Sequence, residues 1–106
     1  MTNEKVLKLF KQLVLEEGLP NPHVYLFGSR TRQNYSADSD WDFFVISDKK
    51  LSQEATLAFK RNIRTKFYAK YLCPIDVILR DKNAYTREKK VPNTLSYAVA
   101  REGIAI

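Results

Sequence analysis

Two stretches decide the fold of this chain: LFGSRTR at residues 26–32 and SDWDFFVI at residues 39–46. The first is an apolar run that stops at a Gly-Ser pair, and the second opens on aspartates at alternate positions, Asp40 and Asp42. Because alternate residues of a strand share a face, we expect the two carboxylates to lie side by side. Neighbouring carboxylates repel each other unless a cation lies between them, and Mg²⁺ binds protein carboxylates together with substrate phosphates. The pattern therefore predicts a magnesium site at the start of a strand.

The Gly-Ser pair predicts the phosphate side of the same site. Gly28 lets the backbone approach a phosphate closely, and N–H groups at the start of a following helix attract anions. Ser29 adds hydroxyl and N–H donors for a terminal phosphate, although a simple helix cap is the alternative reading. Arg30 either binds phosphate or braces the carboxylates from behind. We expect Gly28, Ser29 and Arg30 to bind the phosphates of a ligand.

A third acidic residue lies further along the chain, where Asp76 interrupts the apolar run IDVIL at residues 75–79. Acidic side chains are rarely buried without a partner, and a bound metal ion or Arg30 would supply one. We therefore predict Asp40, Asp42 and Asp76 as a set of metal-binding carboxylates.

Composition limits the remaining possibilities. A chain of 106 residues with 44% hydrophobic residues fits one domain over residues 1–106, and no apolar run approaches the roughly 20 residues that span a bilayer. The single cysteine, Cys73, permits no internal disulfide and favours the cytoplasm, and the lack of a Cys/His cluster argues against zinc. The net charge of +6 indicates an anionic partner, which could be a nucleotide, a nucleic acid or an acidic protein surface.

Periodicity and turn residues predict the order of elements. We expect helices at 4–17, 52–71 and 94–101, a helical turn at 30–33, strands at 23–27, 40–46 and 75–79, an edge strand at 104–106, and polar connections at 34–39 and 81–90. Mixed helices and strands with short connections predict a layered α/β domain on a small mixed sheet.

The helix predicted at 52–71 carries an apolar residue at every fourth position and a basic face opposite. The basic residues are Lys60, Arg61, Arg64, Lys66 and Lys70. This face is either solvated or a surface for RNA or an acidic partner.

The Gly28-Ser29 pair, the Asp40-x-Asp42 motif and Asp76 together resemble the nucleotidyltransferase superfamily typified by DNA polymerase β. Within it, the chain is most similar to the minimal, single-domain nucleotidyltransferases. The resemblance implies a polymerase β-like palm fold, a two-ion Mg²⁺ site and transfer of a nucleoside monophosphate, AMP from ATP, to a hydroxyl. In that scheme Asp40 and Asp42 hold the ion that binds the triphosphate, and all three aspartates hold a second ion that lowers the pKa of the attacking hydroxyl.

The same resemblance implies a partner. Minimal nucleotidyltransferases often act as antitoxins beside a helical HEPN-domain toxin, to whose tyrosine they transfer AMP. A chain this short has no room for an acceptor-binding domain, which fits the use of a partner's surface. Two alternatives stay open: a module that neutralises a toxin by contact without catalysis, and a catalytic subunit of a small-molecule nucleotidyltransferase. Nucleic acid is a possible but not a favoured partner, and we expect no membrane.

Overall fold

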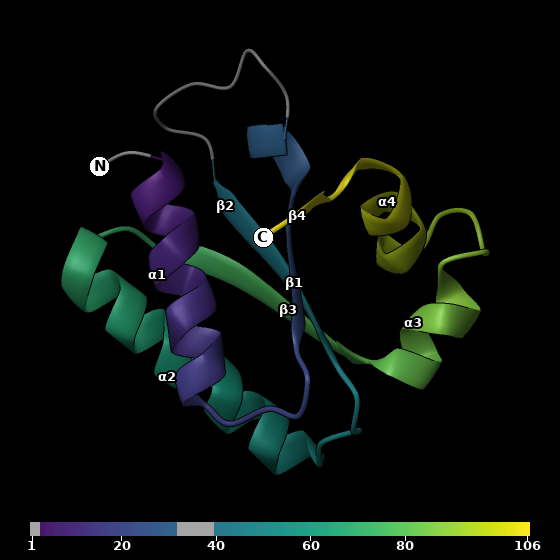
Figure 1. Cartoon of the computed structure of the whole chain (residues 1–106), viewed down its shortest axis with the longest axis horizontal. Helices are drawn as coiled ribbons and strands as arrows, with labels where there is room; N and C mark the ends of the chain where they lie inside the picture. The colour runs from purple at the N-terminus through teal and green to yellow at the C-terminus, as the bar shows by residue number, and fades with distance from the viewer. Residues whose placement is uncertain (1–2, 32–39) are drawn as a thin grey trace.

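The structure is a computed structural model that describes residues 3–31 and 40–106, in which one four-stranded sheet has helices on both faces (Figure 1). In chain order the elements are α1 Asn3–Glu16, β1 His23–Phe27, the 3-10 turn η1 Gly28–Thr31, β2 Trp41–Ser47, α2 Gln53–Tyr71, β3 Ile75–Asp81, α3 Lys82–Glu88, α4 Leu95–Glu102 and β4 Ile104–Ala105. The predicted α/β class is confirmed.

The sheet has the strand order β3-β2-β1-β4. Strand β1 pairs antiparallel with β2 and with β4, while β2 and β3 run parallel. A parallel pair cannot be closed by a tight hairpin, and α2 makes the crossover between β2 and β3. The central strand β2 is buried along most of its length, as its apolar run FFVI predicts.

Helix α2 has both the capping residues and the buried apolar stripe that stabilise a helix. The Ser52 hydroxyl accepts a hydrogen bond from Ala55 N at 3.1 Å and so caps the first turn. Phe59, Ile63 and Phe67 recur every four residues and are buried. At the other end Leu72 takes a left-handed conformation, with φ of 54°.

The two faces of the sheet carry separate cores. Helices α1 and α2 cover one face, where Phe10 stacks on Phe43 with ring centroids 3.7 Å apart. Helices α3 and α4 lie on the other side, where Phe44 and Ile46 pack with Val99 (Figure 1). Because side chains alternate along β2, Asp42 belongs to the same face as Phe44 and Ile46.

Several predicted bounds are wrong, and β3 continues to Asp81 instead of ending at residue 79. Strand β2 begins at Trp41 rather than Asp40, so Asp40 lies just before the strand. Residues 82–88, predicted as a polar connection, form α3, whose first turn is capped by the Asp81 carboxylate accepting from Ala84 N at 3.1 Å. The helix has no buried residue, so it lacks the apolar period that reveals helices in a sequence.

The loop predicted at 34–39 lies outside the described residues, as do the last two residues of the helical turn predicted at 30–33. That turn begins two residues earlier than predicted, at Gly28. Among the residues that the structure describes, none of the helices has the length and apolarity that crossing a bilayer requires.

Candidate active site

Two of the predicted carboxylates are paired in the sheet. Asp42 of β2 lies opposite Asp76 of β3 in the parallel register, and the two strands are about 4.8 Å apart. The neighbours of Asp76, Ile75 and Val77, are buried in the core under α1 and α2. Alternation therefore puts Asp76 on the same face as Asp42, and the fold brings together two aspartates that are far apart in the sequence.

Asp40 joins this pair at the N-terminal end of β2. It is exposed, and it lines the same pocket of about 390 Å³ as Asp42 and Asp76. The other lining residues are Trp41, Arg64, Pro74 and Ile75. The three predicted carboxylates thus share one pocket, although the strand that was expected to hold both Asp40 and Asp42 holds only the second.

Burial and neighbouring charge act on Asp42 in the same direction. Its pKa is raised above the usual 3.8, first by desolvation and then by the negative charges of Asp76 and Asp40. Burial and the two neighbouring carboxylates therefore all oppose ionisation of Asp42.

A divalent cation fits this arrangement by charge and by donor type, because carboxylate oxygens are the ligands that Mg²⁺ prefers. Within residues 3–31 and 40–106, no group of three or more Asp, Glu, His or Cys side chains is already arranged to hold a metal ion. Carboxylates that share a pocket repel one another, so they are expected to draw together when a cation lies between them.

Gly28 lies directly against Asp42. It opens η1 with φ of +80°, a conformation that side chains of L residues rarely adopt, and the Thr31 hydroxyl donates to its carbonyl at 2.7 Å. A Cβ at Gly28 would overlap Asp42 Oδ2 and lie 3.1 Å from Asp42 Cγ. The glycine therefore leaves room for a site carboxylate, where the sequence suggested room for a phosphate. Ser29 also lies in η1, but its side chain is outside the described part of the structure.

Arg30 turns toward Trp41. Its side chain is only 7% exposed, and its guanidinium carbon lies 3.9 Å from the centroid of the Trp41 ring. Trp41 belongs to the core under α1 and α2, on the opposite side of the strand from Asp42. This contact accords with bracing of the carboxylate strand from behind, and phosphate contact by Arg30 stays a prediction.

We expect Arg30→Met to destabilise the fold by about 1–2 kcal/mol, since it removes a buried cation–π contact and keeps most of the side-chain length. Urea unfolding measures this loss. Titration with Mg-ATP separates the two roles: a bracing arginine leaves the ATP affinity within about threefold, whereas a phosphate-binding arginine costs at least tenfold.

Arg64 is a pocket residue that the sequence did not single out. In the sequence it is one of five basic residues of α2, and the structure places it at the pocket beside Asp76 and Ile75. The available signal was the short connection at residues 72–74, which brings the last turns of α2 next to the first residues of β3. Of the other basic residues on this helix, Lys66 lies 3.7 Å from Glu17 in an ion pair.

Comparison with known proteins shows the family of the chain. Residues 20–106 match the family model described as polymerase beta, nucleotidyltransferase, and the chain belongs to this family. The match includes the Gly28 turn and all three pocket aspartates. No curated protein has a sequence that matches the chain significantly.

Three solved structures share the fold. A complex of a tri-AMPylated Shewanella oneidensis HEPN toxin with an MNT antitoxin matches with a TM-score of 0.56 and 18% identity, covering 98% of this chain and 71% of that one. A toxin–antitoxin structure with AMP-PNP matches with a TM-score of 0.56 and 20% identity, covering 98% and 72%. A mutant MntA–HpeT toxin–antitoxin structure matches with a TM-score of 0.52 and 19% identity, covering 99% and 71%.

Proposed function

We propose that this protein is a Mg²⁺-dependent nucleotidyltransferase that transfers AMP from ATP to a tyrosine hydroxyl of a HEPN toxin and thereby neutralises the toxin. The observation that carries the proposal is the pairing of Asp42 with Asp76 beside Gly28, in a chain of the polymerase β family. The toxin partner is supported by the similar solved structures, one with a tri-AMPylated HEPN toxin and one with AMP-PNP.

In the proposed reaction Asp40, Asp42 and Asp76 would hold the metal, and Gly28, Ser29 and Arg30 are the proposed nucleotide-binding residues. When bound, Mg²⁺ neutralises phosphate charge and lowers the pKa of the attacking hydroxyl. The tyrosine oxygen forms a bond to the α-phosphorus, the bond between the α- and β-phosphates breaks, and pyrophosphate leaves. The tyrosine proton passes to water. The chain's contribution is position and charge, because phosphoryl transfer needs little covalent help from the protein.

The test is to incubate the protein and a HEPN toxin with Mg-ATP and to weigh the toxin by intact-mass spectrometry. The expected result is a gain of one or more AMP residues, located on tyrosine by peptide mapping. An unmodified toxin that is still neutralised, by wild type and by Asp42→Asn alike, would instead support neutralisation by contact. Transfer to an aminoglycoside and not to the toxin would support a small-molecule enzyme.

A further inference from the structure

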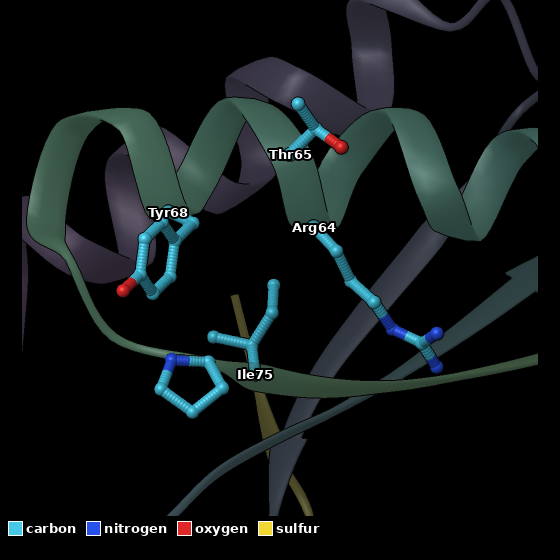
Figure 2. A pocket seen from close by; sticks show the side chains of 5 residues that line it. Arg64, Thr65, Tyr68 and Ile75 are labelled. Atoms are coloured by element: carbon cyan, nitrogen blue, oxygen red, sulfur yellow. The ribbon is translucent and has the colours of Figure 1, made fainter.

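A second hollow lies next to the carboxylate pocket, between α2 and the start of β3. It has a volume of about 330 Å³ and is lined by Arg64, Thr65, Tyr68, Pro74 and Ile75. Figure 2 shows Tyr68 and Arg64 extending from α2 toward the strand that carries Ile75. Arg64, Pro74 and Ile75 line both this hollow and the carboxylate pocket, so the two spaces adjoin each other.

The hollow is apolar where it is far from the carboxylates. Tyr68 is 53% exposed although it is a large aromatic residue, and nearby in the chain Leu72 is 74% exposed. Arg64 is the cationic residue at the junction with the carboxylate pocket. An apolar recess with one charged group at its inner end suits a flat apolar ring that carries a polar atom at its tip.

The order of strands decides which part of the reaction this hollow serves. Gly28 follows β1, Asp42 lies on β2 and Asp76 on β3, so the three occupy successive positions across the sheet. If the leaving phosphates lie beside Gly28 and Ser29, as proposed above, they are on the β1 side of the carboxylates. The attacking oxygen must then arrive from the opposite side, because the attacking and leaving oxygens are roughly in line at phosphorus. The hollow lies on that flank, because it is lined by α2 and by the start of β3, the edge strand. Ile75 faces the core under α2 and Asp76 faces the other side of the sheet, so an acceptor in the hollow would reach the carboxylates around the start of β3, past Arg64.

We propose that the hollow formed by Arg64, Tyr68, Pro74 and Ile75 is the acceptor subsite, and that it receives the phenol ring of a tyrosine side chain. The ring packs against Tyr68 and Pro74, and its hydroxyl points past Arg64 toward the carboxylates. The bond changes are those given above: a new bond joins the phenol oxygen to the α-phosphorus, pyrophosphate leaves and the proton passes to water. This assignment rests on the proposed function and adds a preference for aromatic acceptors.

The experiment uses N-acetyl-tyrosinamide as the acceptor probe and N-acetyl-serinamide as its aliphatic counterpart, with Mg-ATP as donor. We expect the tyrosine probe to be adenylylated at least tenfold more efficiently than the serine probe. Tyr68→Ala should raise KM for the tyrosine probe about tenfold, since it removes one aromatic contact, while the dissociation constant of Mg-ATP stays within twofold. Tyr68→Phe keeps the ring and should restore the KM.

The matched control is Leu57→Ala, because Leu57 is similarly exposed at 58% and lies on the same helix, roughly 16 Å from Tyr68 along the axis. This control should leave both constants unchanged. A parallel loss of Mg-ATP affinity in Tyr68→Ala would assign the hollow to the nucleobase and overturn the proposal. Equal use of the two probes, or an unchanged KM in Tyr68→Ala, would also overturn it.

Failure of the underlying function is a separate result. It would appear in the wild-type protein as the absence of AMP transfer to both probes and to a HEPN toxin, together with no release of AMP and pyrophosphate from ATP. Release of AMP without transfer to the tyrosine probe would leave the nucleotide chemistry intact and would count against the acceptor subsite alone.

Discussion

Asp42→Asn is expected to lower the rate of AMP transfer about a thousandfold, because several kcal/mol of stabilisation by the metal depends on the carboxylate charge. Asn has nearly the same volume, so the variant removes charge without creating a cavity. Intact-mass spectrometry of the acceptor over time measures the rate. The matched control is Asp48→Asn, an exposed aspartate just after the same strand, which changes the net charge equally and should transfer AMP at the wild-type rate.

The same variant should be more stable than wild type in metal-free buffer at neutral pH. The pKa of Asp42 is raised in the folded protein by burial and by the charges of Asp76 and Asp40, so its ionisation opposes folding. Between the unfolded and folded pKa values the folded state binds more protons than the unfolded state, and stability falls as pH rises through that window. The advantage of Asp42→Asn is therefore present above the folded pKa and disappears as pH falls toward 3.8.

Thermal unfolding at several pH values tests whether the ionised Asp42 carboxylate destabilises the folded protein. A more stable variant that has lost transfer would separate a catalytic role of Asp42 from a structural one. A variant that is less stable than wild type at neutral pH would mean that Asp42 is held by favourable contacts. Substantial residual transfer would contradict the proposed role of Asp42 in holding the metal.

The sequence predicted those features that depend on local pattern. The four-residue period of α2 and the apolar run of β2 each predict which residues are buried. In the structure Phe59, Ile63 and Phe67 are buried as expected. The position of Asp76 inside an apolar run also marked it as a site residue, since a buried acid requires a partner. Each of these signals lies within a few residues of the feature that it predicts.

The features that were missed depend on distant contacts or on weak local signals. Arg64 reaches the pocket because the crossover places α2 against β3, and a run of basic residues along a helix does not show which one faces a site. Helix α3 has no fully buried residue, so its capping residue Asp81 is its main local signal. The boundary error at Asp40 arose because the alternation of charge in Asp40-x-Asp42 does not reveal where strand pairing begins.

Gly28→Ala is expected to lower the rate of AMP transfer at least a hundredfold, an effect second only to that of Asp42→Asn. The added Cβ would overlap Asp42 Oδ2 and lie 3.3 Å from Asp42 Cβ, so the whole aspartate side chain, and not its tip alone, must move. A shift of about 1 Å in a reacting group can cost a hundredfold in rate. The measurement is AMP transfer by intact mass, with a Mg-ATP titration alongside it to detect any loss of nucleotide affinity.

The chain offers a close control for backbone strain. Gly18 has φ of +76°, close to the +80° of Gly28, but a Cβ there would meet nothing within 4 Å. Gly18→Ala and Gly28→Ala should therefore both lose about 1–2 kcal/mol of stability through the left-handed backbone conformation. Only Gly28→Ala should also lose transfer, because only its Cβ displaces a site carboxylate. If both variants kept wild-type transfer, the close approach of Gly28 to Asp42 would have no part in the reaction. If both lost transfer equally, backbone strain alone would explain the effect, and the proposed role of Gly28 would fail.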